Sequence, residues 1–416
     1  MGNYIFDGIK ALDMGTGGTV PLALKWLGDH GASVIKVETH LRLDSARMGG
    51  PFYGFIPGAN RGGWQVWLNS TKYSFTVNLA KPRGRDLIKQ LVVKWQPHIL
   101  AESYRPGVMK KWGLDYDSIK KLKSDIIYWS SCIEGQYGPH CMRLGYGSVT
   151  SNLSGVGYLT GWPDRPPAGV PLAYSDFPAV GTGLIAITSA LIRQRRTGKG
   201  VHLDQSQYES NLYVLAAPIL EYLVNGRVME RNGNRLSQAA PHGVYPCEGT
   251  DRWVAIAVFT DEEWRSFCDV IGNPDWTKAP KFATLAGRKQ SEDELDQLVG
   301  EWTKIHKAED VESAMQARGV AANVVEDNQD IYEDPQMKYR GHFREVEHPE
   351  VGKVRGELPP FRLSKSGERH FRAPLLGEHN NLILSEFLGL SDGEISDLYA
   401  EGAITTDADL PQPRKQ

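Results

Sequence analysis

The chain has 416 residues, 41% hydrophobic and 23% charged, which is typical of a folded globular protein and too long for one ordinary domain. Its 47 Lys and Arg against 50 Asp and Glu give a net charge of −3, which excludes a whole-chain affinity for nucleic acid. Its four cysteines lack CxxC spacing, which favours reduced thiols in a cytoplasmic protein over a disulfide scaffold or a zinc site.

The sequence contains no pattern typical of membrane association. Its first residues show no basic segment followed by an apolar core, so we expect no secretory signal there. The longest apolar run, residues 179–192, is shorter than the about 20 residues that a membrane-spanning helix needs. We therefore expect no contact with a membrane.

Strands and helices alternate through the first half of the chain. The patterns predict strands at 9–14, 33–39, 73–79, 98–103, 126–131 and 201–207, with helices at 20–31, 84–95, 117–124, 179–196 and 207–224. Alternation of this kind is typical of a parallel sheet covered by helices. We therefore predict a large Rossmann-like α/β domain over residues 1–227.

A smaller α+β domain is predicted over residues 228–330. Two strands are expected within 243–259, followed by amphipathic helices at 260–272 and 291–306, and Ser291 with Glu294 fits a capping box for the second helix. Residues 331–416 are interpreted as a linker and a C-terminal segment that returns to the large domain. This segment is irregular at first and ends in a helical pair with a second capping box, Ser391 with Glu394.

The turn after the first strand resembles part of a dinucleotide-binding fingerprint. Gly15, Gly17 and Gly18 follow the strand, and Glu38 ends the next one, where an acid can bind a ribose. Val20 occupies the third glycine position, so the pattern is incomplete. NAD binding is one alternative, beside a plain turn and a helix N-terminus that binds another phosphate.

Two further stretches are candidates for ligand contact. Tyr104 lies among basic residues at 105, 110, 111, 120, 121 and 123, a composition that can hold a phosphorylated aromatic ligand by charge and stacking. The alternative is a solvated helix face. Residues 69–72, just before a predicted strand, are either a polar contact edge or an ordinary turn.

A single acidic residue, Asp176, lies between two apolar stretches. Ser175 or Asp176 can cap the helix that follows, with Pro178 in its first turn. A carboxylate at a helix N-terminus is also favoured as the anion and can attack an activated acyl group. Both interpretations stay open, whereas the absence of HExxH and GxSxG patterns disfavours a metalloprotease or a serine hydrolase.

Four blocks in order resemble the family III CoA-transferases over nearly the whole chain. They are GIKALDMGTGG with WLGDHGASVIKVE, LNSTKYSFTVNL, ESYRPGVMKKWGLDYDSIKKLKSDIIYWSSCIEGQYGP, and APLLGEHNNLILSEFLGLSDGEISDLYAEGAI. The resemblance implies a Rossmann-like large domain, a smaller domain and an interlocked dimer. The dimer can be a homodimer or a heteromer with a paralogous subunit.

The resemblance also implies roles for particular residues. Asp176 matches the catalytic aspartate of the family. The implied contacts with CoA are Gly17, Gly18, Thr19, Leu68, Asn69, Thr71, Lys72, Ser103, Tyr104, Arg105 and Lys111. Two positions depart from the family pattern: Thr39 replaces a basic residue, for which Arg42 can substitute, and Ser103 replaces an Asn. No metal and no permanently bound cofactor are implied, because coenzyme A and acyl-CoA are substrates.

The implied reaction moves CoA from an acyl-CoA to a free carboxylic acid through an aspartyl anhydride and an aspartyl-CoA thioester. Similarity to the succinyl-CoA:benzylsuccinate subgroup implies succinyl-CoA as donor and an aromatic acceptor. Aromatic residues at 64, 67, 137, 158 and 162 suit such an acid or belong to the core. One alternative is an acyl-CoA racemase, although Tyr146 replaces the histidine that such an enzyme needs as a base. The other is a non-catalytic subunit of a heteromeric transferase.

Overall fold

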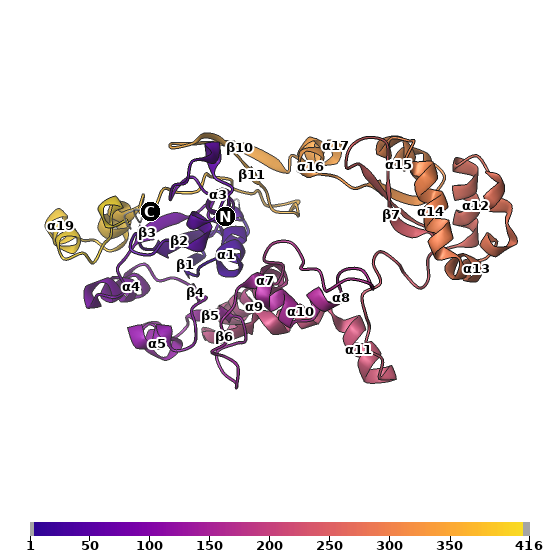
Figure 1. Cartoon of the computed structure of the whole chain (residues 1–416). Helices are drawn as coiled ribbons and strands as arrows, with labels where there is room; N and C mark the ends of the chain where they lie inside the picture. Colours follow the sequence, from indigo (N-terminus) through magenta and orange to yellow (C-terminus); the bar gives the residue numbers. More distant parts are fainter. Residues whose placement is uncertain (1–3, 411–416) are drawn as a thin grey trace, which may run out of the picture. The chain divides into compact units, whose positions relative to one another are not determined.

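The computed structural model describes residues 4–410 and contains a six-stranded sheet in the order β3-β2-β1-β4-β5-β6 (Figure 1). Every neighbouring pair is parallel. The strands are β1 (Lys10–Met14), β2 (Ser33–Glu38), β3 (Tyr73–Thr76), β4 (Ile99–Glu102), β5 (Ile127–Cys132) and β6 (Val201–Ser206). The predicted Rossmann-like α/β fold is confirmed.

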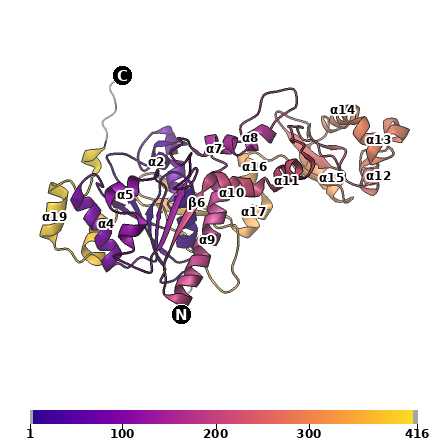
Figure 2. The ribbon, with the colours of Figure 1, turned by 90° about the horizontal axis from the view of Figure 1, so that it is seen from below.

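Successive side chains along each strand point to opposite faces of the sheet and belong to two separate hydrophobic cores. On β1, Leu12 belongs to one core with α4 (Pro82–Lys94) and α19 (Asp392–Ala400). Its neighbour Ala11 belongs to the other, with α1 (Thr19–Asp29) and α9 (Asp176–Thr197). Figure 2 shows α4 and α19 on one side of the sheet and α9 on the other. Because both faces are covered, the strands read as nearly continuous apolar runs.

The sheet has a switch point between β1 and β4. From β1 the chain proceeds to β2 and β3 on one side, then returns to place β4, β5 and β6 on the other. In such sheets the loops that leave the two central strands at their carboxyl ends diverge, and a crevice opens between them.

The chain divides into two compact units. The first contains residues 1–157, 169–228 and 339–416. The second contains 158–168 and 229–338, so it includes a short early stretch that the sequence assigned to the large domain.

The second unit has its own antiparallel sheet and core. The sheet order is β7 (His242–Pro246), β8 (Trp253–Ala257), β9 (Ala321–Val324), and the last strand was not anticipated. Residues of α12 (Asp261–Val270), α14 (Glu292–Thr303) and α15 (Ala308–Gln316) pack on it through side chains such as Phe267, Val299 and Met315.

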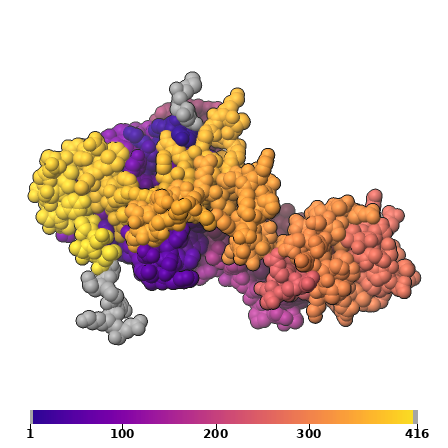
Figure 3. All heavy atoms as spheres, turned by 90° about the horizontal axis from the view of Figure 1, so that it is seen from above, coloured from indigo at the N-terminus to yellow at the C-terminus, as the bar shows by residue number. Residues whose placement is uncertain are grey.

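The C-terminal segment of the first unit, yellow in Figure 3, is bonded to β3. Asn380 Oδ1 accepts a hydrogen bond from the Thr76 backbone N–H at 2.9 Å, and the Thr76 hydroxyl donates to the Thr405 carbonyl at 2.8 Å. Earlier in the segment, β10 (Phe343–His348) and β11 (Gly352–Glu357) form a hairpin, whereas the sequence pattern predicted irregular chain there.

Short helices complete the chain. They are α2 (Ser45–Met48), α3 (Gly63–Leu68), α5 (Val108–Trp112), α6 (Tyr116–Ile119), α7 (Gly147–Leu153), α8 (Val156–Leu159), α10 (Gln207–Val214), α11 (Ala216–Asn225), α13 (Leu285–Gln290), α16 (Asn328–Glu333), α17 (Pro335–Arg340) and α18 (Asn380–Leu382). The helix predicted over 207–224 is interrupted at Leu215. Pro218 explains the break, because it has no N–H for the carbonyl four residues earlier and its ring collides with that turn.

One of the two predicted capping boxes is present. Ser391 accepts from the Glu394 N–H, and the Glu394 side chain accepts from the Ser391 N–H. Ser291 makes no capping bond, and Glu294 pairs with Lys281 instead. Ser291 ends α13 with φ −112° and ψ 27°, outside the extended conformation that points a cap side chain at the next turn.

Across residues 4–410, no helix has both the length and the apolar character required to cross a membrane. Within the same range, no group of His, Cys, Asp and Glu side chains is arranged to hold a metal ion. All four cysteines are unpaired.

Candidate active site

A cavity of about 1060 Å³ opens at the carboxyl edge of the six-stranded sheet. Its walls come from the loops that follow β1 to β5, together with the start of α9 and Gln207 at the start of α10. This is the edge at which ligands bind in open parallel sheets. The cavity therefore marks the candidate active site.

Asp176 is the first residue of α9 and lines this cavity. Ser175, at the N-cap position, does not cap the helix: its hydroxyl donates to the Gly147 carbonyl at 2.8 Å and its N–H donates to Ser151 Oγ at 3.0 Å. The Asp176 carboxylate lies against the backbone of Gly18. The carboxylate is therefore directed across the cavity wall toward the turn after β1, and the Ser175 cap expected as the simpler alternative is absent.

Two glycines make room for the carboxylate. A Cβ placed on Gly18 would lie 2.5 Å from Asp176 Oδ2, and one on Gly147 would lie 3.1 Å from Oδ1. Both distances are shorter than ordinary van der Waals contact. The Asp176 side chain is thus held between two stretches of bare backbone.

Burial raises the pKa of Asp176 to about 6, and the nearby Thr19 hydroxyl opposes part of this rise. The group is therefore ionised at neutral pH but more basic than an ordinary aspartate. A partly desolvated, oriented anion with this basicity is suited to nucleophilic attack on a carbonyl.

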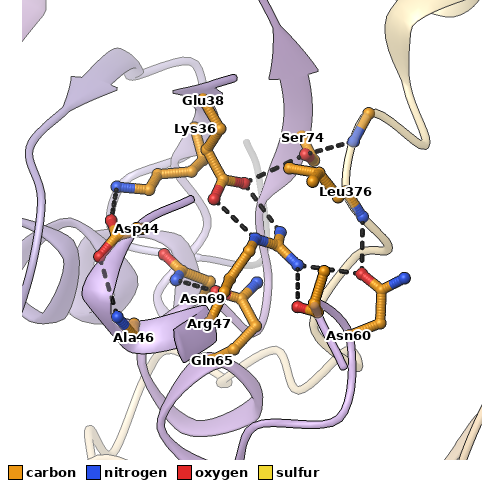
Figure 4. A network of polar contacts seen from close by, with 12 residues as sticks. Lys36, Glu38, Asp44, Ala46, Arg47, Asn60, Gln65, Asn69, Ser74 and Leu376 are labelled. Atoms are coloured by element: carbon orange, nitrogen blue, oxygen red, sulfur yellow. Dashed lines mark hydrogen bonds and ion pairs between the residues drawn. The ribbon is translucent and has the colours of Figure 1, made fainter. Parts of the chain in front are cut away.

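A buried ion pair fixes the turn after β1. Asp44 accepts hydrogen bonds from the backbone N–H groups of Gly17 and Ala46, both at 3.0 Å. Lys36 Nζ lies 3.1 Å from Asp44 Oδ2 and also donates to the Gly15 carbonyl. Figure 4 shows Lys36 and Asp44 facing each other. The neighbouring carboxylates hold the pKa of Lys36 above its ordinary value, so the pair remains charged.

Glu38 is not free to bind a ribose. Its carboxylate accepts from Arg47 Nε at 2.7 Å and Nη2 at 2.8 Å, and from the Ser74 hydroxyl at 3.2 Å (Figure 4). A bidentate, buried pair of this kind uses the oxygens that a dinucleotide would need. The NAD alternative therefore loses its acidic residue.

The structure brings Ser103, Tyr104 and Arg105 to the cavity. The Ser103 hydroxyl accepts from the Thr16 N–H at 2.8 Å, and Arg105 Nη2 donates to the Met142 carbonyl at 3.3 Å. The Tyr104 ring packs edge-on against Trp112 at 5.1 Å between centroids. These residues form an aromatic and basic wall around the opening.

Five other predicted CoA contacts do not line this cavity. Lys111 is exposed on α5. Leu68, Asn69, Thr71 and Lys72 are buried and precede β3.

A residue that precedes a strand of a parallel sheet lies at its amino edge, opposite the cavity. Lys72 is used there as an internal cation, 2.7 Å from Asp13 Oδ2 and 2.8 Å from Asn69 Oδ1. Thr71 donates to Asp29 Oδ1 at 2.9 Å.

Residues 77–80 reach the cavity after β3, and they were not among the predicted contacts. The signal was available, because these residues lie at the carboxyl end of the strand predicted over 73–79, and the carboxyl ends of parallel strands form the binding edge. Arg42 and Arg143 also line the cavity. With Arg105 they are the cationic side chains among its lining residues, all of which lie in the described part of the chain.

None of the five aromatic residues considered for an aromatic acceptor lines this cavity. Trp64 and Trp67 pack against the core of the α1 face. Tyr137 is 81% exposed. Tyr158 and Trp162 belong to the second unit.

The model of CoA-transferase family III matches residues 6–380. The chain belongs to this family. Among its relatives, the succinyl-CoA–D-citramalate CoA-transferase of Chloroflexus aurantiacus is 31% identical over 402 residues, covering 96% of this chain and 98% of the relative. The human succinyl-CoA:glutarate CoA-transferase is 29% identical over 403 residues, covering 96% and 89%.

A solved structure of a CaiB/BaiF family protein from Brucella suis superimposes with a TM-score of 0.85 at 31% identity, covering 93% of this chain and 100% of that one. The family III CoA-transferase identified from sequence blocks is therefore confirmed. At the family level, the chain is an enzyme that transfers CoA between an acyl-CoA and a carboxylic acid.

Proposed function

We propose that this enzyme transfers CoA from succinyl-CoA to a dicarboxylic acid and that Asp176 is its nucleophile. The observation that carries the proposal is the ionisable Asp176 carboxylate, which is desolvated, opens into a cavity at the carboxyl edge and is flanked by glycine backbone. The names of the two relatives, which pair succinyl-CoA with D-citramalate or glutarate, support the donor and the class of acceptor.

The proposed reaction begins with attack of an Asp176 oxygen on the thioester carbonyl carbon of succinyl-CoA. The C–S bond breaks, leaving a mixed anhydride and CoA thiolate. The thiolate then attacks the Asp176 carbonyl carbon, releases succinate and forms an aspartyl-CoA thioester.

In the second half, the acceptor carboxylate attacks the same Asp176 carbon and expels the thiolate. The thiolate attacks the acyl carbon of the acceptor, which yields the new CoA ester and restores the Asp176 carboxylate. One thioester replaces another, so the reaction needs no further energy source. Retention of CoA in the cavity keeps its thiolate at high effective concentration through both halves.

We propose that CoA is held by the cavity wall described above. Gly18, Ser103, Tyr104 and Arg105 remain in the proposed contact set because they line the cavity, and Val77–Ala80 replaces residues 68–72. Arg42, Arg105 and Arg143 supply positive charge for phosphates or carboxylates. We propose that exposed Lys111 does not contact CoA and contributes only to the positive electrostatic potential around the cavity.

The acceptor is proposed to be aliphatic. The aromatic acid predicted from the sequence stays a prediction, but the side chains that suggested it lie elsewhere. The racemase alternative is disfavoured because no histidine is found among the lining residues, all of them within the described chain, and Tyr146 lies on the wall.

We also propose that the enzyme works as a dimer, interlocked as the family resemblance implies, in the cytoplasm. Helix α11 supports this proposal, because it offers an apolar surface on which a second subunit can pack. None of its residues is buried, and Leu223 and Val224 are 71% and 75% exposed. Light scattering after size exclusion should give twice the chain mass of 46.2 kDa. A mass of one chain would contradict the dimer.

The test of the activity uses the chain purified alone. Succinyl-CoA is incubated with D-citramalate, glutarate, L-malate and benzylsuccinate in turn, and CoA esters are resolved by mass spectrometry. We expect a new CoA ester with at least one dicarboxylic acid, equimolar succinate, and neither with Asp176→Ala. Formation of a new ester by Asp176→Ala at the wild-type rate would refute the assignment of Asp176 as the nucleophile. Activity that appears only on adding a paralogous subunit would favour the non-catalytic alternative.

A further inference from the structure

Two neighbouring loops of the cavity wall are bonded to the same short stretch of the C-terminal segment. The first loop, residues 39–44, follows β2, and the second, residues 77–80, follows β3. They leave the sheet next to each other, where the Val77 N–H donates to the Glu38 carbonyl at 2.8 Å. Residues 402–407, which we call the C-terminal clasp, bond to both loops.

The C-terminal clasp bonds the first loop at His40. The His40 backbone N–H donates to Thr405 Oγ1 at 3.1 Å, and His40 Nδ1 lies 3.0 Å from the same oxygen. On the other side of the ring, His40 Nε2 lies 3.3 Å from Asp407 Oδ1. His40 and Thr405 are only 2% and 1% exposed, so their contact is shielded from water.

One tautomer of His40 satisfies every polar group in this contact. With its proton on Nε2, the ring donates to Asp407 and leaves the Nδ1 lone pair to accept. The Thr405 hydroxyl then donates its single proton to Nδ1 and accepts the His40 backbone N–H through a lone pair. Burial lowers the pKa of His40, which agrees with a neutral ring. The contact therefore depends on the hydroxyl of Thr405.

The C-terminal clasp bonds the second loop through its backbone. The Asn78 N–H donates to the Ala403 carbonyl at 2.8 Å, and Asn78 Nδ2 donates to the Gly402 carbonyl at 3.2 Å. Val77 pairs with Ile404 in an antiparallel bridge. Ala403 and Ile404 also belong to the buried core on the α4 face of the sheet, which fixes the clasp itself.

The bonded residues lie next to residues that face the cavity. His40 is two positions before Arg42, which is exposed and lines the cavity, and Asn78 lines the cavity itself. Because Arg42 is exposed, the backbone of its loop determines where its guanidinium reaches. A loop that is ordered before binding loses less conformational entropy when a ligand binds. The clasp can therefore change the affinity for a ligand that it does not touch.

We propose that the C-terminal clasp is a positioning element for CoA, with Thr405 and His40 as its positioning residues. The proposal rests on the proposed function, in which CoA occupies this cavity. The clasp holds the two loops in their binding conformation before CoA arrives. Neither Thr405 nor His40, both in the described part of the chain, lines the cavity, so they act through the loops.

The test measures CoA affinity without turnover, by isothermal titration calorimetry with free CoA. The isosteric variant Thr405→Val removes the hydroxyl that bonds His40 twice, and we expect its Kd for CoA to rise about 10-fold. Thr405→Ser keeps the hydroxyl and should bind CoA as the wild type does. The Asp407 side chain is 86% exposed, so Asp407→Ala should fold, and it should raise the Kd about threefold.

Steady-state kinetics provide the second readout. The KM of Thr405→Val for succinyl-CoA should rise with the Kd, whereas kcat at saturating succinyl-CoA should stay within about twofold of the wild type. The matched control is Ser396→Ala, which removes a hydroxyl in the same segment that donates to the Asp392 carbonyl at 2.8 Å. It should leave the Kd and the KM unchanged.

An unchanged Kd in folded Thr405→Val would overturn the proposal, even if its free energy of unfolding falls, because the contact would then serve stability alone. If Thr405→Val does not fold, an unchanged Kd in Asp407→Ala would overturn it. An equal rise in Thr405→Ser or in Ser396→Ala would do the same, since the effect would not depend on the Thr405 hydroxyl. Failure of the wild type to bind CoA would refute the proposed function instead.

Discussion

Replacement of Gly18 by alanine should separate the placement of the nucleophile from the stability of the fold. Gly18 has φ −95° and ψ −57°, a backbone conformation that alanine adopts readily. The new Cβ would lie 2.5 Å from Asp176 Oδ2, and ordinary contact begins at 3.4 Å, so the carboxylate must retreat by about 0.9 Å. It is the end of a side chain on the wall of an open cavity, so it can move without unfolding its surroundings.

A displacement of about 1 Å at a reacting group can cost about 10² in rate, or about 2.7 kcal/mol of transition-state stabilisation. We therefore expect kcat of Gly18→Ala to fall about 100-fold in the CoA-exchange assay, with a free energy of unfolding within about 1 kcal/mol of the wild type.

The matched control is Gly181→Ala, in α9 but with no atom within 4 Å of the added Cβ. It should keep full activity and gain about 0.5–1 kcal/mol in stability, because alanine is the better helix former. Full activity in Gly18→Ala would refute the reasoning. Unfolding of Gly18→Ala would also count against it, since the carboxylate would then be unable to move aside.

Three more outcomes follow from the buried groups and caps. The folded pKa of Asp176, about 6, exceeds its ordinary value of 3.8, so its ionisation destabilises the fold as pH rises between the two. Asp176→Asn should therefore abolish transfer yet add about 1–2 kcal/mol to the free energy of unfolding at pH 7.5 and little at pH 3.5, measured by urea titration; an equal gain at both pH values would contradict this. Arg47→Met leaves Glu38 buried without its partner and should cost about 3–5 kcal/mol, most of it recovered when Glu38→Gln is added. Ser391→Ala should destabilise by about 1 kcal/mol through loss of a cap, whereas Ser291→Ala, which removes no capping bond, should stay within about 0.5 kcal/mol.

The sequence predicted the sheet well because its strands are buried on both faces. Short apolar runs such as 9–14 and 126–131, which alternate with predicted helices along the chain, are typical of strands in a parallel sheet that is covered on both faces. The hairpin at 343–357 was not predicted, because its strands alternate charged residues and only Val354 and His348 are buried in it. Pairing of one strand with the other determines such a hairpin more than burial does.

The candidate site could be predicted only in part. Asp176 could be predicted because it is a single acidic residue between two apolar stretches, at the start of the helix that orients it. Residues 68, 69, 71 and 72 were selected by resemblance, whereas the rule that the carboxyl ends of parallel strands form the binding edge would have pointed to residues 77–80, at the end of the strand predicted over 73–79. The bond between Gln207 and Thr19 joins residues 188 positions apart. No local pattern announces such a contact, because it depends on how β1 and β6 are placed in one sheet.

The most direct test of the account is to trap the acyl group on the enzyme. Succinyl-CoA is added to the enzyme without acceptor, hydroxylamine is added at once, and the resulting hydroxamate is located by peptide mass spectrometry. The account predicts a hydroxamate on Asp176 that is absent without succinyl-CoA. A hydroxamate on any other carboxylate, with Asp176 unmodified while CoA exchange proceeds, would contradict it.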